Sequence, residues 1–332
     1  MRIWTLLLLL CPMAPLDAAE IRGNTMGSPY QVKWHGEAAA IDPEQLQHQV
    51  HQRLAQLNHT FSHFQPQSEL SRFNRSAQGG EVSTALLEVV HRANTLHQHT
   101  EGTLDITVAP LVSLWGFGPD GAITTPPSAK AIAEARAKTG MEKLTLGPQR
   151  LEKSHPNLTL NLGAIAKGYA VDQLAELLEA RGVPNYLINV GGEMRLKGHN
   201  PQGNLWRIGI EQPGSKGQQS MLTVAPGDAA VATSGDYRQY FRHQGKHYTH
   251  IIDPTLGAPI QSQVISATVI HPYCLEADGY ATAAMVMGAE RALAMAEHLG
   301  LAMMLIEVED GQWQLHRSRA FKQLTSRDPP GL

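Results

Sequence analysis

The chain is organised around one stretch, Glu276-Ala277-Asp278-Gly279-Tyr280-Ala281-Thr282-Ala283-Ala284-Met285-Val286-Met287. It is apolar and rich in small residues, and we predict a helix over residues 277–287. Asp278 and Thr282 carry its two hard oxygen ligands, and a spacing of four residues places both side chains on one helix face. A carboxylate and a hydroxyl in this arrangement suit a small hard cation such as Mg²⁺. The alternative is purely structural, since an Asp in the first turn also caps a helix and complements its dipole.

Composition indicates a globular protein. The 332 residues are 42% hydrophobic and 17% charged, enough for one large domain or two ordinary ones. The formal net charge is −3 and the sequence has no basic block, which argues against a nucleic-acid partner. The 16 histidines are spread along the chain without a metal-binding spacing such as HExxH.

The N-terminal residues 1–19 have the pattern of a secretory signal peptide. Arg2 supplies the positive charge, Leu6 to Leu10 form the apolar core, and Asp17-Ala18-Ala19 offers small residues for cleavage. We therefore predict export to the periplasm of one domain spanning residues 20–332, built as one unit or as two lobes. No other apolar run reaches the length of a membrane-spanning helix, so we predict no transmembrane helix in the mature chain.

Cys11 opens an alternative for this leader. If Cys11 were lipidated, the protein would be anchored at the inner membrane. The residue before a lipidated cysteine is normally small, however, and Leu10 is large, which favours ordinary cleavage. Cleavage would leave Cys274 as the one remaining cysteine, so we predict no intrachain disulfide.

Hydrophobic periodicity and turn residues predict an α+β fold. Asp42 and Ser83 are predicted helix caps, and Pro126-Pro127-Ser128 is predicted to start a helix that runs to about Lys138. Residues 61–74 lack clear periodicity and are predicted to be a loop or irregular edge. The other predicted helices cover residues 165–181, 277–287 and 289–298. The predicted strands cover residues 30–34, 143–146, 158–162, 186–190, 205–210, 221–224, 229–233, 247–252, 264–270, 303–308 and 313–316.

A strand that turns directly into a helix lies at Asn161-Leu162-Gly163-Ala164-Ile165-Ala166-Lys167-Gly168. Small residues allow close approach of the backbone, and a helix N-terminus offers N–H groups to an anion. Lys167 opposes the helix dipole at this position, which a bound phosphate would offset. Helix–sheet packing with a solvated lysine explains the same residues equally well.

Three further motifs permit a functional and a structural interpretation. The double glycine in Val190-Gly191-Gly192-Glu193 is expected in a ligand-binding turn and also in a tight structural turn. The hydroxyl-rich segment at 232–237 could hold a ligand or cap a hairpin. His250, in a strand that ends at Asp253-Pro254, could act as a general base or as a structural histidine.

Taken together, these segments resemble the ApbE family of FAD:protein FMN transferases, in family order and over nearly the whole mature chain. The resemblance rests on four blocks: 68–74 (SELSRFN); 105–111 (DITVAPL) with 114–119 (LWGFGP); 161–172 with Gly191-Gly192; and 250–254 (HIIDP) with Asp278 and Thr282. It implies an ApbE-like α+β fold, with mixed or antiparallel sheets flanked by helices and FAD in a central cleft.

The resemblance also implies a reaction and its residues. The FMN half of FAD would be transferred with Mg²⁺ to a Ser or Thr hydroxyl in a motif of an acceptor flavoprotein, and AMP would leave. His250 matches the family histidine that takes the hydroxyl proton. Metal ligands are expected at the Ala164 carbonyl, Asp278 and Thr282. Flavin contacts are expected at Met26, Phe64, Thr103, Leu104, Asp105, Asn161, Lys167 and Ile252.

The sequence departs from the family pattern at three of its positions. Phe64 replaces a frequent Tyr, Asn161 replaces a frequent Asp, and Ala281 replaces an acid found in some relatives, which would lower metal affinity. Two alternative functions remain open at this point. One is an FAD pyrophosphatase that gives FMN and AMP, and the other is a noncatalytic FAD-binding protein.

Overall fold

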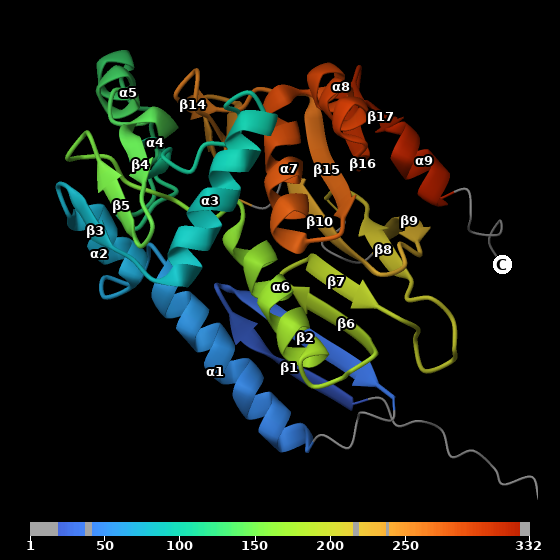
Figure 1. Ribbon diagram of the computed structural model, residues 1–332. Coiled ribbons are helices and arrows are strands. Elements are labelled where there is room, and N and C mark those ends of the chain that lie inside the picture. Colours follow the sequence, from blue (N-terminus) through green and yellow to red (C-terminus); the bar gives the residue numbers. More distant parts are fainter. Residues whose placement is uncertain (1–18, 37–41, 215–218, 237–238, 326–332) are drawn as a thin grey trace, which may run out of the picture.

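An eight-stranded antiparallel sheet forms the centre of the computed structural model, which describes residues 19–36, 42–214, 219–236 and 239–325 (Figure 1). Its strands lie in the order β1 (Ala19–Thr25), β2 (Ser28–His35), β6 (Asn185–Val190), β7 (Glu193–Lys197), β10 (Ala229–Gly235), β15 (Val264–His271), β16 (Ala302–Glu309) and β17 (Gln312–Arg317). Residues 1–18 of the predicted leader, Cys11 among them, lie outside the described residues. Ala19, its predicted last residue, pairs with Trp34 as the first residue of β1.

Nine α-helices and four small sheets surround this sheet in the described part of the chain. The helices are α1 (Pro43–Phe61), α2 (Glu69–Arg75), α3 (Thr84–His99), α4 (Ala109–Leu114), α5 (Ala129–Arg136), α6 (Ala166–Glu179), α7 (Cys274–Met287), α8 (Ala289–Leu299) and α9 (Arg319–Thr325), with a short 3₁₀ turn at Met141–Lys143. The smaller sheets pair β3 (Gly79–Glu81), β5 (Arg150–Lys153) and β4 (Leu144–Leu146); β8 (Ile208–Glu211) and β9 (Ser220–Val224); β11 (Tyr240–His243) and β12 (Lys246–Thr249); and β13 (Ile252–Asp253) and β14 (Ala258–Pro259).

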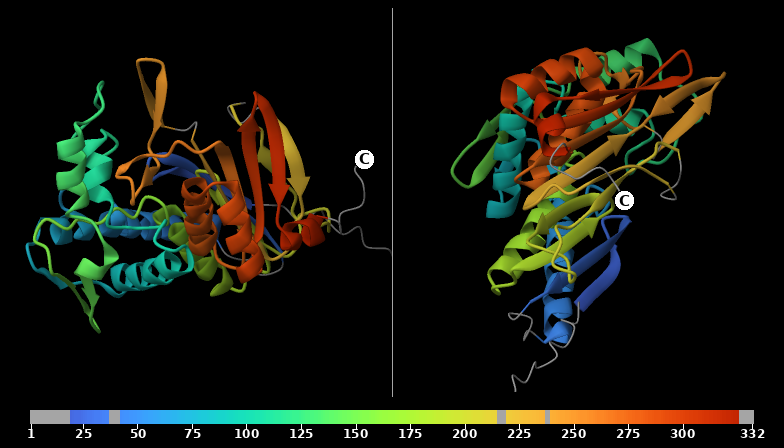
Figure 2. Two further views of the ribbon diagram at one scale, coloured as in Figure 1. Left: turned by 90° about the horizontal axis from the view of Figure 1, so that it is seen from above. Right: turned by 90° about the vertical axis from the view of Figure 1, so that its right-hand side faces the viewer.

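The central sheet lies between two cores because its strands alternate apolar side chains between its two faces. Val269 and Met303 face the larger core, which includes side chains of α1, α3, α6, α7 and α8. Their neighbours Ile270 and Met304 face the opposite core, where β8, β9 and α9 cover the sheet. This period of two is the strand pattern expected for a sheet between two layers, and the layers are visible in both views of Figure 2.

Helix α7 is buried nearly all round, so its position depends on its neighbours rather than on one apolar stripe. Its N-terminus has no side-chain cap of its own. Instead, the Asp172 carboxylate of α6 accepts hydrogen bonds from the backbone N–H groups of Cys274 (2.9 Å) and Leu275 (3.0 Å). Arg195 donates to the same carboxylate at 2.9 Å. This buried network fixes the start of α7 against α6.

The predicted α+β fold class is confirmed, and so are the caps at Asp42 and Ser83. The helix start predicted at 126–128 is also found, with Ser128 capping α5. The prediction for residues 61–74 is confirmed for the loop at 62–68 and wrong for 69–74, because Ser68 caps the short helix α2 with its hydroxyl at 3.0 Å from the Ser71 N–H. The strand predicted at 158–162 was also wrong. Its backbone joins no strand ladder, and the Asn74 side chain pairs with Leu160 instead.

Candidate functional site

A cavity of about 780 Å³ brings together all twelve residues expected at the site. They come from segments that are far apart in the sequence, including the β1–β2 turn, the loop after α3, the start of α6, the segment after β12 and the middle of α7. The expected residues that line the cavity are Met26, Phe64, Thr103, Leu104, Asp105, Asn161, Ala164, Lys167, His250, Ile252, Asp278 and Thr282. The structure thus shows their convergence, while their individual roles remain expectations.

The three residues expected to supply oxygen ligands all line this cavity. Asp278 is 4% exposed, and its Oδ2 accepts a hydrogen bond from the Gly168 N–H at 3.2 Å. One turn later, the Thr282 hydroxyl lies 3.1 Å from the Ser234 hydroxyl of β10. Ala164 lines the same cavity just before α6. A carboxylate, a hydroxyl and a backbone carbonyl form the kind of all-oxygen set that fits Mg²⁺.

The described part of the chain holds no group of three or more His, Cys, Asp and Glu side chains suited to a metal ion. This finding does not conflict with the expected ligand set, which has a single carboxylate. Mg²⁺ commonly takes one or two carboxylates and completes its coordination with phosphate oxygens and water. The donor set in the cavity therefore fits a Mg²⁺ that binds together with a phosphorylated substrate.

The start of α6 presents a cation to the cavity. Lys167 lies in the first turn, where the helix N-terminus is already electropositive. Its ammonium pairs with Glu193 Oε1 at 2.5 Å, and the Glu193 side chain is only 2% exposed. The second oxygen, Glu193 Oε2, is buried and has no hydrogen-bond partner among the described residues. A buried pair that is only partly satisfied is unfavourable for folding alone, which points to a role at the site.

The turn that leads into α6 is fixed by two asparagines. Asn74 of α2 donates to the Leu160 carbonyl at 2.9 Å and accepts from the Leu160 N–H at 2.8 Å. The next residue, Asn161, accepts from the Gly163 N–H through its Oδ1 at 2.8 Å. The block 68–74 therefore acts from outside the cavity, by holding the backbone that places Asn161 and Ala164.

His250 lies on the cavity wall directly after β12. Its Nδ1 is 3.1 Å from the Gln239 carbonyl oxygen, and Phe117 meets the ring edge-on at 6.4 Å between centroids. Because a carbonyl oxygen only accepts, Nδ1 carries the proton of the neutral ring. Nε2 is then the nitrogen that can take up a proton, as a general base requires.

The remaining walls combine aromatic, polar and apolar groups. Phe64 is 62% exposed and packs against His63 with ring centroids 4.1 Å apart. Met26 has a positive φ of 47°, unusual for a residue with a side chain, in the tight turn between β1 and β2. Burial raises the pKa of Asp105, while hydrogen bonds from the Thr107 N–H (2.7 Å) and hydroxyl (2.6 Å) oppose that shift.

Glu193 and Ser234 are two of the cavity-wall residues that sequence reasoning did not assign to the site. Glu193 was interpreted only as part of a glycine turn, although an acid directly after a double glycine was an available signal. Ser234 belongs to the hydroxyl-rich segment at 232–237, for which a ligand-binding role was left open. Its contact with Thr282 could not be foreseen, because it joins β10 to α7 across 48 residues.

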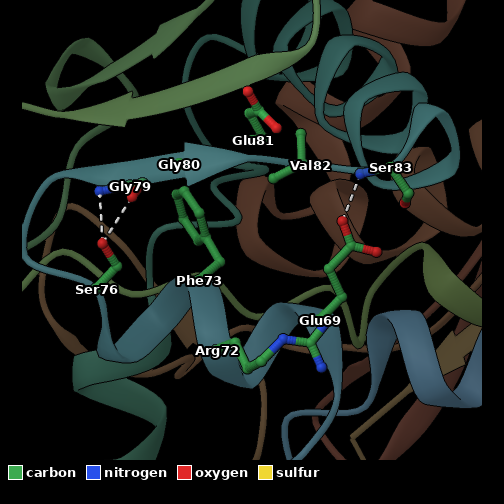
Figure 3. A pocket seen from close by; sticks show the side chains of 9 residues that line it. All are labelled: Glu69, Arg72, Phe73, Ser76, Gly79, Gly80, Glu81, Val82 and Ser83. Carbon is green, nitrogen blue, oxygen red and sulfur yellow. Dashed lines mark hydrogen bonds between the residues drawn. The ribbon is translucent and has the colours of Figure 1, made fainter.

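A second cavity of about 400 Å³ lies between α2 and β3 (Figure 3). Its polar groups are used locally: Glu69 accepts from the Ser83 N–H, and the Ser76 hydroxyl bonds with both backbone groups of Gly79. The expected site residues all line the larger cavity instead.

None of the described helices has the length and apolarity needed to cross a membrane.

Comparisons with known proteins identify sequence and structural relatives of this chain. A sequence model described as the ApbE family matches residues 26–305. The FAD:protein FMN transferase of Vibrio cholerae serotype O1 is 42% identical over 334 residues, covering 98% of this chain and 100% of that protein. The solved structure of the flavin transferase ApbE from Vibrio cholerae superposes with a TM-score of 0.87, over 93% of this chain and 100% of that one. The apo form of the Pseudomonas stutzeri flavinyl transferase ApbE, 36% identical, gives a TM-score of 0.88 over 96% and 100%.

Proposed function

The chain belongs to the ApbE family, and from this premise we propose that it transfers the FMN half of FAD to a Ser or Thr hydroxyl of an acceptor flavoprotein, with release of AMP. The predicted enzyme class, FAD:protein FMN transferase, is confirmed by the relatives that carry this name.

The observation that carries the proposal is the composition of the 780 Å³ cavity. It combines an all-oxygen group at Asp278, Thr282 and Ala164 with the cation Lys167 and with His250. Binding of a flavin alone requires neither a metal set nor a base. Transfer of a phosphoryl-linked group needs charge stabilisation on the phosphates and a group that accepts the proton of the nucleophile.

The residues have distinct roles in this scheme. Asp278, Thr282 and the Ala164 carbonyl would hold Mg²⁺, which acts as a Lewis acid on phosphoryl oxygens when bound. Lys167 and the N-terminus of α6 bind the pyrophosphate of FAD. Phe64 and Met26 contact the flavin, together with the loop at 103–105 and the side chains of Asn161 and Ile252.

The chemical step balances without a further reagent. The acceptor oxygen forms a bond to the phosphorus on the FMN side, and the bond from that phosphorus to the AMP oxygen breaks. Nε2 of His250 takes the hydroxyl proton, because an alcohol is a weak nucleophile at neutral pH. The Gln239 carbonyl keeps the proton of the neutral ring on Nδ1, so that Nε2 is the site of uptake.

The test incubates the mature protein with FAD, Mg²⁺ and candidate acceptor domains, followed by a denaturing gel viewed under ultraviolet light. We expect a fluorescent acceptor band that is lost with EDTA, together with one AMP per FMN transferred. AMP and free FMN without a labelled protein would favour the FAD pyrophosphatase. Bound FAD without either product would favour the noncatalytic FAD-binding protein.

We propose that the mature enzyme acts in the periplasm, on the basis of the leader pattern at residues 1–19. Lipidation at Cys11 would attach it to the inner membrane. Mass spectrometry of the protein purified from the exporting cell distinguishes the two outcomes. Cleavage near Ala19 supports the soluble form, and an N-terminal lipidated Cys11 supports the anchored form.

A further inference from the structure

The hairpin of β11 and β12 stands apart from the central sheet and ends at the cavity. Its turn is tight, with positive φ at Gln244 (48°) and Gly245 (78°), the pattern of a two-residue hairpin loop. At the other end, the His250 N–H donates to the Gln239 carbonyl at 3.1 Å, which extends the pairing to two residues of the cavity wall. The hairpin therefore begins and ends at the cavity wall, and in the left view of Figure 2 it stands out from the rest of the molecule.

One face of this hairpin is anchored by aromatic rings. Phe241 and Tyr248 stack at 4.9 Å between centroids with an interplanar angle of 11°. Tyr248 continues the stack onto Trp115 at 5.6 Å, and Phe241 contacts Phe117 at 5.9 Å. These rings belong to one apolar cluster with α4, so the hairpin presents its opposite face in a defined position.

Away from these rings, the hairpin exposes Tyr240, Arg242 and His247 on its opposite face and Lys246 beside its turn; we call these four exposed residues together the outer face. Tyr240 is 48% exposed, contacts His247 edge-on at 4.3 Å, and lies under the Arg242 guanidinium at 5.8 Å. Tyr and Arg are the residue types enriched in the energetically dominant parts of protein interfaces.

The outer face is also electropositive in a chain whose formal net charge is −3. Residues 239–249 contain Arg242 and Lys246 and no Asp or Glu. Asp236, the nearest acid earlier in the sequence, interacts with His247, and burial raises its pKa. Arg242 and Lys246 therefore give this face a local positive charge.

We propose that the outer face is the docking surface for the acceptor protein, and that it binds an acidic segment next to the accepting hydroxyl. This inference rests on the proposed function. A hydroxyl that reaches His250 must be carried by a chain that leaves the cavity, and at about 3.3 Å per residue three or four residues span the length of β12. That chain then passes within reach of Arg242 and Lys246. Negative charge on it would speed the association of acceptor and enzyme and orient the acceptor.

The test uses the full-length mature enzyme and the acceptor protein that the wild type labels in the gel assay above. The variant Arg242→Glu/Lys246→Glu reverses both charges of the outer face. Arg319→Glu/Lys322→Glu reverses two exposed charges on α9 and is the matched control, because it alters net charge equally. Thermal melting confirms that both variants fold, and flavin fluorescence quenching gives the FAD affinity of each.

We expect the outer-face variant to raise KM for the acceptor about tenfold at low salt, with FAD affinity and kcat within about twofold of wild type. The wild-type KM for the acceptor should rise with salt concentration, while the KM of the variant should stay nearly constant.

An unchanged KM in the outer-face variant, or an equal rise in the α9 control, would refute the assignment of the outer face as the docking surface. The proposed function would remain intact. Loss of wild-type binding to phosphatidylglycerol vesicles in the outer-face variant, with unchanged KM, would assign the surface to a membrane instead. Absence of labelling by the wild type would refute the proposed function itself.

Discussion

The Gly168 backbone N–H of α6 donates a hydrogen bond to the Asp278 carboxylate of α7 across 3.2 Å. The two helices approach closely because residue 168 lacks a side chain. A Cβ at this position would lie 2.4 Å from the Cys274 carbonyl oxygen and 2.8 Å from the Leu275 Cα. The contact therefore couples helix packing to the orientation of an expected metal ligand.

Gly168→Ala should damage stability and the site together. The added methyl meets backbone rather than a flexible side chain, so α6 and α7 must move apart. Overpacking of this kind lowers the free energy of unfolding by about 1–3 kcal/mol. We also expect weaker Mg²⁺-dependent FAD binding, because Asp278 moves with α7. Urea denaturation and flavin fluorescence titration measure the two effects.

Gly80→Ala is the matched control for this substitution. Beyond its own chain neighbours, no atom would lie within 4 Å of a Cβ added to Gly80, and its φ is not in the left-handed region. It should change neither stability nor binding by a measurable amount. Equal behaviour of the two variants would contradict the proposed coupling between α6 and α7.

Asp278→Asn should weaken Mg²⁺ binding in the presence of FAD by about tenfold or more, since the amide removes the only carboxylate of the expected set. Thr282→Val keeps the shape but removes the hydroxyl, so a smaller loss is expected. Calorimetric titration of Mg²⁺ into the FAD-bound protein measures both. Thr223→Val, on the exposed side of β9, is the control. Unaltered Mg²⁺ affinity in Asp278→Asn would remove Asp278 from the ligand set.

His250→Ala should separate binding from chemistry. FAD affinity is expected to stay within about twofold of wild type, while the rate of FMN transfer falls by about 10²-fold or more, as for loss of a general base. His298→Gln, exposed on α8, should transfer FMN normally. Unchanged transfer by His250→Ala in a single-turnover assay would refute the assignment of His250 as the base.

Substitutions at Lys167 and Glu193 should affect the free energy of unfolding and the affinity for FAD differently. Lys167→Met leaves a buried carboxylate without this cation, and we expect a loss of about 1–3 kcal/mol in unfolding free energy. Adding Glu193→Gln should restore much of this stability, because the buried charge is gone. FAD affinity should remain low in both variants, since the phosphate-binding cation is absent. Recovery of FAD affinity in the double variant would show that Lys167 does not bind the pyrophosphate.

Much of the fold could be predicted from local sequence signals. Asp42 and Ser83 mark helix starts with side-chain caps, and both were predicted because capping depends on neighbouring residues. The helix α2 was missed because seven residues give too little periodicity to detect. The extended segment at Leu160 has the composition of a strand, but its partner is the Asn74 side chain rather than a neighbouring strand.

The candidate site could be predicted as a set only through the resemblance to a family. Spacing alone placed Asp278 and Thr282 on one helix face, because a helix repeats every 3.6 residues. The contacts that orient them, from Gly168 and Ser234, join segments 110 and 48 residues apart. The Lys167–Glu193 pair is likewise a product of tertiary structure, and no local pattern encodes it.

Lys153 gives a pH-dependent prediction outside the cavity. Its ammonium donates to the Asn74 carbonyl (3.1 Å) and the Ser76 carbonyl (2.8 Å) and lies 4.6 Å from the centre of the Phe73 ring. Burial lowers its pKa from 10.5 to about 8. Between these values the unfolded chain binds the proton more tightly than the folded protein, so this group makes unfolding free energy rise with pH. Below pH 8 both states are protonated, and the burial penalty is present in full.

Lys153→Met removes this titration and keeps the apolar stem. The difference in unfolding free energy, wild type minus variant, should therefore increase as pH rises from 8 to 10, by at most about 1.4 kcal/mol per pH unit. Lys130→Met removes an exposed lysine on α5, whose side chain is 88% accessible, and its difference from wild type should stay constant over the same range. Urea unfolding at several pH values measures both differences. If the difference for Lys153→Met did not change with pH, Lys153 would have the same pKa in the folded and unfolded states. Its hydrogen bonds to the two carbonyl groups would then offset the whole effect of burial.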